Sequence, residues 1–251
     1  QTVSAVSFVV DAGAWGPTSV LGGSNGAWLR AQPFKPGGWY VGAFGGPSSI
    51  ARYELGAGFS DAGAIPAASA GSLSVTPAGE AILVFQSLAI GSPGIYAAEC
   101  SQMLVCSTMA IDTDAGLTMS GVESAADGLG NLFAAWLDDA AGQGIKVGGA
   151  RFVTGAGWGA AEDFFSGATF GSASLSVAAS PDGAGVVVWS TGTGQGSGAL
   201  WARRFRPASG WDVPTAFAMS GQGPRVVLHP DGRALVVSIP SVSIGAYLLP
   251  P

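Results

Sequence analysis

Apolar residues come in short, nearly unbroken runs that recur along the chain. Three of these runs read AILVF at 81–85, LFAAW at 132–136 and GVVVW at 185–189. An antiparallel strand with one wet face would alternate apolar and polar residues, so such uniform runs predict strands that are covered on both faces. The runs are too short for a membrane-spanning helix, which needs about 20 apolar residues.

A glycine precedes each run at a fixed distance, which makes the chain a tandem repeat. The pairs, six residues apart, are Gly38 to Phe44, Gly79 to Phe85, Gly130 to Trp136, Gly183 to Trp189 and Gly232 to Ser238. Successive glycines are 41, 51, 53 and 49 residues apart. This interval suits a four-stranded sheet that neighbouring sheets copy. The four strands of a repeat are called A to D here, from the inside of the repeat outward.

Turn residues separate strands A and B. The segments read TPAG at 76–79, SPDG at 180–183 and HPDG at 229–232. Proline presets the first turn angle and glycine accepts a positive φ, so Asp127, Asp182 and Asp231 are predicted to be turn residues rather than catalytic ones. The only histidine, His229, occupies the same turn position as Ser180 and receives the same interpretation.

An aromatic pair marks the turn between strands C and D. Its members are Tyr53 with Phe59, Phe152 with Trp158, Phe205 with Trp211 and, one residue longer, Phe8 with Trp15. In one repeat Cys100 and Cys106 take these two slots, so they should lie opposite each other and form a disulfide. Two free buried thiols are the alternative, and a metal site lacks further ligands nearby. A disulfide indicates an oxidising compartment.

The two ends of the chain carry incomplete repeats. Residues 3–21 show a C–D pattern, and residues 225–248 show an A–B–C pattern. The pattern predicts one all-β domain. Its complete repeats lie at about 23–66, 67–117, 118–170 and 171–219, and residues 220–251 and 1–22 form a closing repeat. We expect a β-propeller of five four-stranded blades that the N-terminal strands close. The two ends together supply five strands for the four places of the last blade. A ring of six blades, one of them incomplete, is therefore the alternative.

Several motifs resemble those of secreted bacterial β-propellers. They are best seen at 182–189, at Ala150-Arg151-Phe152 and at Gly157-Trp158. The chain is also loosely similar to lectin propellers, which hold sugars between or at the tops of blades, and to sialidase-type propellers. The arginine triad and the Ser-x-Asp-x-Gly-x-x-Trp boxes of sialidases are not found here. The resemblance implies a secreted, periplasmic or cell-surface protein, and we expect Gln1 to follow a removed export signal.

Charge and motif content exclude several function classes. Ten Lys and Arg residues against 16 Asp and Glu give a net charge of −6 without a basic cluster, which argues against nucleic acid as a partner. A phosphate-binding loop followed by a helix is missing, so no cofactor is predicted. A single histidine at a turn does not favour Ser-His-Asp chemistry.

The B–C and D–A loops are the longer and more varied ones, and they share one face of a propeller. This face carries Asp112, Asp114, Asp138 and Asp139, with Glu123 at the start of a strand A. Two convergent carboxylates could serve a glycoside hydrolase or lyase, which is one alternative function. The segment 112–116 lacks the later acidic ligands of a calcium loop, so we predict a solvated loop and no metal.

Aromatic residues outside the repeating slots favour ligand binding. Trp28 and Arg30 share one face of a strand A, and Trp201 and Arg203 share one face of a strand C, because alternate residues of a strand point the same way. An aromatic ring beside a guanidinium suits a sugar ring or an anionic glycan, although these residues could instead fill gaps between blades. The sequence thus predicts a non-enzymatic module that binds a carbohydrate or another cell-surface component. A self-associating structural subunit is the remaining alternative.

Overall fold

A computed structural model describes residues 3–5, 8–9, 14–15, 19–22, 28–45, 48–60, 63–87, 93–113, 121–139, 144–167, 172–192, 198–239 and 245–250. These residues form antiparallel strands and no helix, which confirms the all-β class. Within the same ranges, therefore, there is no helix of the length and apolarity that crossing a bilayer requires.

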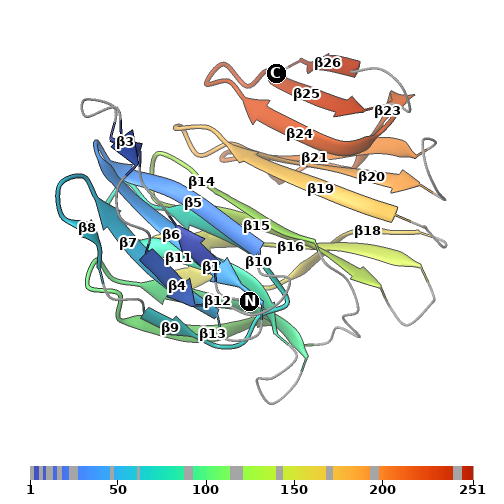
Figure 1. Cartoon of the computed structure of the whole chain (residues 1–251). Helices are drawn as coiled ribbons and strands as arrows, with labels where there is room; N and C mark the ends of the chain where they lie inside the picture. The colour runs from blue at the N-terminus through green and yellow to red at the C-terminus, as the bar shows by residue number, and fades with distance from the viewer. Residues whose placement is uncertain are drawn as a thin grey trace.

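Five main sheets follow one another along the chain (Figure 1). The first contains β5 (Trp28–Lys35), β6 (Gly38–Phe44), β7 (Ser48–Glu54), β8 (Gly58–Phe59) and β9 (Gly63–Ile65). The second contains β10 (Ala70–Val75), β11 (Ala81–Ser87), β12 (Gly94–Cys100) and β13 (Cys106–Asp112). The third contains β14 (Val122–Ala126), β15 (Leu132–Asp139), β16 (Ile145–Val153), β17 (Gly157–Trp158) and β18 (Glu162–Ser166).

The last two main sheets repeat the arrangement. The fourth contains β19 (Ser172–Ala179), β20 (Gly185–Gly192), β21 (Ala199–Arg206), β22 (Gly210–Trp211) and β23 (Thr215–Ser220). The fifth contains β24 (Gln222–Leu228), β25 (Ala234–Ile239) and β26 (Gly245–Leu249). In every main sheet the strand that comes first in the chain lies at one edge and pairs with the next. The inner strands β5, β10, β14, β19 and β24 lie next to one another in that order.

The N-terminal strands form two small hairpin sheets of their own. Strand β1 (Val3–Ala5) pairs with β4 (Ser19–Gly22), and β2 (Phe8–Val9) pairs with β3 (Ala14–Trp15). Strand β4 lies against β7 of the first sheet, and β26 takes the third place of the fifth sheet. Among the described strands, no pairing joins the N-terminal hairpin to the fifth sheet. Closure of the ring, the blade count and the blade boundaries therefore stay predictions.

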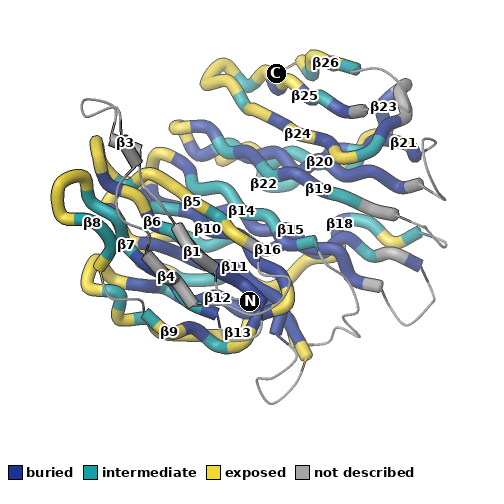
Figure 2. Tube along the Cα trace, viewed as in Figure 1, coloured by how far each residue is buried: buried dark blue, intermediate teal, exposed yellow. Residues whose placement is uncertain are grey.

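The core consists of four apolar clusters, each between two consecutive main sheets. Alternate residues of one strand enter different clusters: Leu83 and Phe85 of β11 pack toward the first sheet, whereas Ile82 and Val84 pack toward the third. Figure 2 shows these central strands as buried along their length. The prediction that the uniform apolar runs are covered on both faces is confirmed.

One register assignment from the sequence is wrong. The turn glycines Gly79, Gly130, Gly183 and Gly232 have φ values between 80° and 92°, but in the first repeat it is Gly37, at 73°, that adopts this conformation. Gly38 is instead the first residue of β6. The first repeat has two adjacent glycines and no Pro-Asp-Gly turn, so spacing alone could not select between them. Phe44 consequently faces the next sheet, whereas Phe85 faces the preceding one.

The turn interpretation of the repeated aspartates agrees with their hydrogen bonds. The Asp127 carboxylate accepts the backbone N–H groups of Leu129 and Asn131, each at 2.8 Å. His229 Nδ1 accepts the N–H of Asp231, and the Arg233 guanidinium holds the pKa of Asp231 well below its usual range. These groups are engaged in closing turns, as the turn interpretation predicts.

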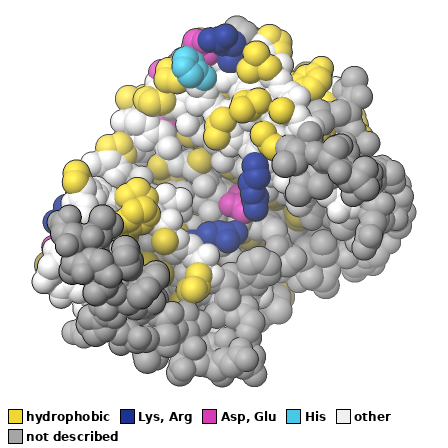
Figure 3. Space-filling model, turned by 45° about the horizontal axis from the view of Figure 1, so that its top comes forward, with side chains coloured by type: hydrophobic (Ala, Val, Ile, Leu, Met, Phe, Trp, Pro, Cys, Tyr) yellow, Lys and Arg dark blue, Asp and Glu magenta, His cyan; other side chains and the backbone are white. Residues whose placement is uncertain are grey.

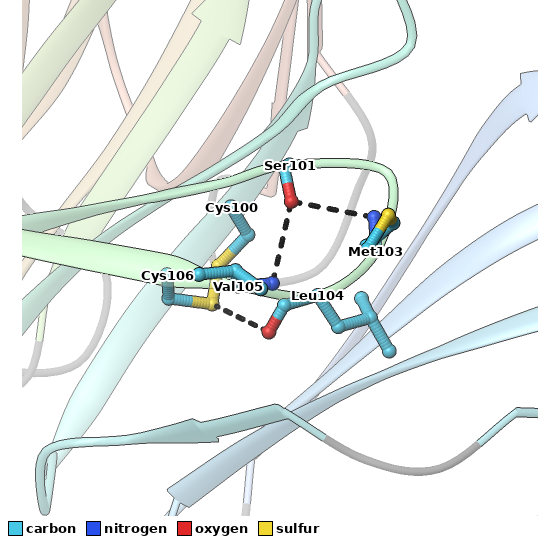
Figure 4. Close-up of a disulfide and its surroundings, with 6 residues drawn as sticks. All are labelled: Cys100, Ser101, Met103, Leu104, Val105 and Cys106. Carbon is cyan, nitrogen blue, oxygen red and sulfur yellow. Dashed lines mark hydrogen bonds between the residues drawn. A yellow bond between two sulfur atoms is a disulfide. The ribbon is translucent and has the colours of Figure 1, made fainter.

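The pairs at the C–D turns also lie as predicted. Tyr53 stands opposite Phe59, Phe152 opposite Trp158 and Phe205 opposite Trp211, with ring centroids 5.1–5.6 Å apart. Cys100 and Cys106 face each other in the same way and form a disulfide, with Cα atoms 4.0 Å apart (Figure 4). Within their turn, the Ser101 hydroxyl accepts the N–H groups of Met103 and Val105.

Two arginines pack against aromatic rings between the third and fourth sheets. The guanidinium of Arg203 lies 4.6 Å from the Phe164 ring of the third sheet and 5.6 Å from that of Trp211. In the opposite direction, Arg151 lies 4.4 Å from the ring of Phe205. Cation–π contacts in such partly desolvated surroundings contribute up to about 2 kcal/mol each. These arginines therefore help to hold the two sheets together.

The outer face of the fifth sheet remains apolar and uncovered by the described residues. Val227, Leu235 and Leu248 are 63%, 41% and 59% exposed. Leu235 follows its turn glycine by three residues, as Ile82 and Val186 follow theirs, and both of those are buried against the next sheet. The fifth sheet thus carries the residues of a packing face without a described sheet to pack on it.

Loss of the disulfide should destabilise the fold measurably. We expect the variant Cys100→Ala/Cys106→Ala to unfold with a free energy about 2 kcal/mol lower, because a short cross-link no longer restricts the unfolded chain. Denaturant unfolding with and without reductant measures this. Reductant should destabilise only the protein with both cysteines, and equal stability of the two proteins without reductant would contradict the prediction.

Arg203 should act as a packing residue. We expect Arg203→Met to lower the free energy of unfolding by about 2 kcal/mol, because the ring contacts and the hydrogen bond to the Asp212 carbonyl are lost. The matched control is Arg206→Met, whose exposed ion pair with Asp212 should contribute less than about 1 kcal/mol. Equal stability of the two variants in denaturant titrations would refute the packing role.

Candidate functional site

The corrected register reveals one repeated position on the five inner strands. It is the residue seven places before each turn glycine, and its occupants are Arg30, Ser72, Glu123, Ser176 and Arg225. They lie on β5, β10, β14, β19 and β24 respectively. We call this set the inner polar position. All five side chains are polar, although on β10, β14, β19 and β24 a neighbouring position supplies a residue to an apolar cluster.

The three charged members of the inner polar position meet. Arg30 Nη2 donates a hydrogen bond to Glu123 Oε1 at 3.1 Å. Arg225 Nη1 lies 3.9 Å from the same oxygen. These residues come from the first, third and fifth sheets, so the folded series of repeats brings its two end sheets to one carboxylate.

The two serines of the inner polar position link adjacent inner strands. Ser72 Oγ accepts the backbone N–H of Ser124 at 2.9 Å, and Ser176 Oγ accepts that of Val226 at 3.2 Å. A short hydroxyl thus satisfies a backbone donor of the neighbouring sheet. Because these side chains are used for this link, ligand contacts at the inner polar position fall to the arginines and Glu123.

A cavity of about 220 Å³ opens beside the three charged residues. Its lining consists of Arg30, Ala70, Gly71, Gly121, Val122, Glu123, Leu137, Ser174, Leu175 and Arg225. We call it the axial cavity because the inner strands of all five main sheets contribute residues to its lining. Leu137 of β15 also lines it. Figure 3 shows basic and acidic side chains side by side in a hollow of the drawn face.

The electrostatics of the axial cavity favour an anion. Burial raises the pKa of Glu123, and the positive charges of Arg30 and Arg225 oppose that shift. Two guanidiniums against one carboxylate leave a local charge of +1 when Glu123 is ionised. The Arg225 side chain is 71% exposed, and within the described part of the chain its guanidinium donates no hydrogen bond. Its N–H donors therefore face the cavity and solvent.

The aromatic candidates from the sequence are placed unequally. Trp28 begins β5, two residues before Arg30, but its side chain lies outside the described residues. Trp201 packs on the Phe165 ring, with centroids 5.1 Å apart, and belongs to the cluster between the third and fourth sheets. Arg203 lies in the same layer, as described above. Trp201 and Arg203 do share one face, but that face is the sheet interface rather than the axial cavity.

The acidic candidates are brought together only in part. Asp163 forms an ion pair with Lys146, and this hydrogen bond, followed by the charges of Asp163, Asp112 and Asp138, raises the pKa of Lys146. Asp112 and Asp138 thus share the surroundings of one lysine. Asp114 and the side chain of Asp139 lie outside the described residues. Among the residues that the structure describes, no cluster of His, Cys, Asp and Glu could hold a metal ion.

A larger cavity, of about 370 Å³, lies between the first and second sheets and includes Arg52, Glu54, Gln102 and Leu104. The Arg52 guanidinium is already held by the Glu54 carboxylate and by the Gln102 carbonyl oxygen at 2.8 Å. Glu54 also pairs with Lys35 at 3.0 Å. The polar groups of this cavity are engaged with one another, so the axial cavity offers the better binding site.

Sequence reasoning missed Arg225 and assigned Glu123 only to a strand start. The signal was available in the spacing of seven residues to the turn glycine. The register based on Gly38 placed Arg30 eight residues from its glycine and so removed it from the set. Spacing also could not show that charges from distant repeats would point at one oxygen.

Comparisons with known proteins support the fold. No protein-family model matches the chain, and no curated protein matches it either. Among solved structures, AofleA from Arthrobotrys oligospora is 10% identical with a TM-score of 0.55, over 95% of this chain and 74% of that one. An Aleuria aurantia lectin variant in complex with alpha-methyl-L-fucoside is 14% identical with a TM-score of 0.53, over 93% and 80% of the two chains. A protein of unknown function from Dyadobacter fermentans is 13% identical with a TM-score of 0.52, over 89% and 78%. Identities this low show the fold alone, and that fold is of the β-propeller class.

Proposed function

We propose that this protein is an exported, non-enzymatic module that binds a glycan of a cell surface or of its surroundings. The observation that carries the proposal is the convergence of Arg30, Glu123 and Arg225 on the axial cavity. Directional donors and an acceptor beside the buried residues Val122, Leu137 and Leu175 provide hydrogen bonds for sugar hydroxyls in a site with an apolar base. The likeness to the fucoside-bound Aleuria aurantia lectin supports a sugar as the ligand.

The axial cavity favours binding over hydrolysis. Glycoside hydrolysis needs two carboxyl groups on either side of the scissile bond, and the described lining contains only Glu123. The raised pKa of Glu123 alone would suit a general acid, but the second carboxyl group is missing from the described lining. Asp112 and Asp138, which the sequence placed in loops, lie instead at the end of β13 and in β15, and their charges raise the pKa of Lys146. A hydrolase or lyase therefore remains the weaker alternative.

We also infer that the repeats close into a five-bladed ring in which the N-terminal strands complete the last blade. Support comes from Arg30 of the first sheet and Arg225 of the fifth, which both reach Glu123. This contact holds the two end sheets of the series near each other, as closure requires. Export is supported by the disulfide, which oxidising compartments favour.

A second candidate function is a structural subunit that self-associates. The exposed apolar residues Val227, Leu235 and Leu248 on the fifth sheet favour it, since uncovered apolar faces of this kind mark interfaces. The occupant would be a second copy of the chain, whose sheets carry the matching packing residues. Arg225 and Val227 share the exposed face of β24, so a second copy seated on the fifth sheet would lie beside the axial cavity and would compete with a glycan.

The glycan-binding proposal predicts a defined result on a glycan array. The folded protein should bind at least one sugar, and Arg225→Ala should weaken binding about tenfold or more, because hydrogen bonds to a charged donor contribute about 1.5–3 kcal/mol. Arg233→Ala is the matched control, since it removes an arginine of the β24–β25 turn that pairs with Asp231. Failure to bind any glycan would reject the function, and equal binding by the two variants would reject the site.

The self-association candidate predicts a dimer or larger species in light scattering. We expect Val227→Lys/Leu235→Lys to convert that species to a monomer, because charges would then oppose the apolar contact. The control is Leu129→Lys, which changes an exposed leucine in the turn between β14 and β15. A wild-type protein that stays monomeric at high concentration would eliminate this candidate.

A further inference from the structure

We propose that the glycan held in the axial cavity is an acidic one, a sugar unit whose carboxylate or sulfate group binds Arg225 and Arg30. This inference rests on the proposed glycan-binding function and specifies its ligand. It follows from the charge, the geometry and the size of the cavity.

The arginines define an anion position. Both guanidiniums approach Glu123 Oε1, at 3.1 Å from Arg30 and 3.9 Å from Arg225. Only the shorter contact is a hydrogen bond. Arg225 thus contributes positive charge to this position while its planar set of N–H donors stays available. A guanidinium binds carboxylate and sulfate through paired N–H···O bonds, which neutral sugars cannot match in strength.

The environment of this position makes the charge effective. Glu123 is three-quarters buried, and the cavity walls around the three charged groups include Val122, Leu137 and Leu175. Charges in such surroundings are screened less than on an open surface. The local charge of +1 stands in a chain whose net charge is −6, so an anion is attracted by the site and not by the protein as a whole.

The cavity volume limits the ligand to a small group. About 220 Å³ is below the roughly 300–1,000 Å³ of sites that enclose drug-sized ligands. A single sugar unit at the end of a chain fits this volume better than an internal stretch of a polysaccharide. The acidic group would then enter toward the arginines and Glu123, and the rest of the sugar would extend toward solvent.

Glu123 acts in this arrangement as an internal competitor for the arginines. When it is ionised, it repels an incoming anion and holds Arg30. When it takes up a proton, the local charge rises from +1 to +2 and the hold on Arg30 weakens. The other ionisable groups that line the cavity in the described residues are Arg30 from β5 and Arg225 from β24, and both stay charged. Anion affinity should therefore increase as the pH falls.

The ligand would also join the two ends of the repeat series. Arg30 belongs to the first sheet and Arg225 to the fifth, so one anion that binds both bridges them. A ligand that binds the folded state alone stabilises it by mass action. Binding should consequently raise the melting temperature of the whole domain.

Calorimetric titration and thermal unfolding with three probes test the proposal: glucuronate, glucose 6-sulfate and glucose. We expect one or both acidic probes to bind and to raise the melting temperature, and glucose to bind at least about tenfold more weakly. The two acidic probes show whether carboxylate or sulfate is preferred. Binding should weaken with added salt.

Three variants make the test specific. Arg225→Gln should weaken binding of the preferred acidic probe about tenfold to a hundredfold, and Arg225→Lys should restore part of it because the charge is kept. Glu123→Gln should bind at least as tightly as the wild type between pH 7 and 5 and should lose the pH dependence, since the competing charge is gone. Arg233→Gln is the control and should bind as the wild type does.

The outcomes separate this inference from the function on which it rests. Suppose that glucose or another neutral sugar on the array binds as tightly as its acidic counterparts, and that Arg225→Gln does not alter the ratio of the two affinities. The acidic ligand is then refuted, while glycan binding stands. If no sugar of either kind binds to the folded wild type, both fall. Weaker acidic-sugar binding by Glu123→Gln would also overturn the assignment, because the Glu123 carboxylate would then favour binding of the anion rather than compete with it.

Discussion

The structure depends on one constraint, which is that the central strands are apolar on both faces. Leu83 and Phe85 of β11 need a cover on one side, and Ile82 and Val84 need one on the other. A sheet of this kind is unstable alone, because desolvating one face still leaves the other in water. The second, third and fourth sheets therefore each stand between two others. Repetition of that requirement produces a series of sheets whose inner strands lie side by side.

The same constraint creates the candidate site. When the sheets stack face to face, their five inner strands lie side by side. Each inner strand carries the inner polar position, seven residues before its turn glycine. The occupants differ in type because the serines serve as short links between strands, as Ser72 does toward Ser124, whereas three repeats have long charged side chains that reach further. Packing thus fixes the position, and the residue at that position decides its chemistry.

The sequence predicted the class of fold, the turn roles of Asp127 and His229, and the Cys100–Cys106 disulfide, because each depends on local spacing within one repeat. It was wrong about Gly38, since adjacent glycines have the same propensity and only the folded turn selects Gly37. The meeting of Arg30 with Arg225 could not be read from the chain, because it depends on how 194 intervening positions fold. Trp201 and Arg203 were correctly paired on one face, but which surface that face meets is a property of the neighbouring sheet.

The contrast between Arg203 and Arg225 shows what separates a packing arginine from a binding one. Arg203 packs on Phe164 and Trp211, donates to the Asp212 carbonyl oxygen and pairs with the Glu162 carboxylate at 3.4 Å, so its charge and its donors are used within the fold. Arg225 shares a carboxylate that Arg30 already holds, and most of its side chain reaches solvent. A buried carboxylate facing two guanidiniums costs desolvation energy and leaves one positive charge uncompensated. Packing alone does not require such a group, because serine serves at the equivalent position of the second and fourth sheets. The charge of the axial cavity is best explained by a ligand that supplies the missing anion.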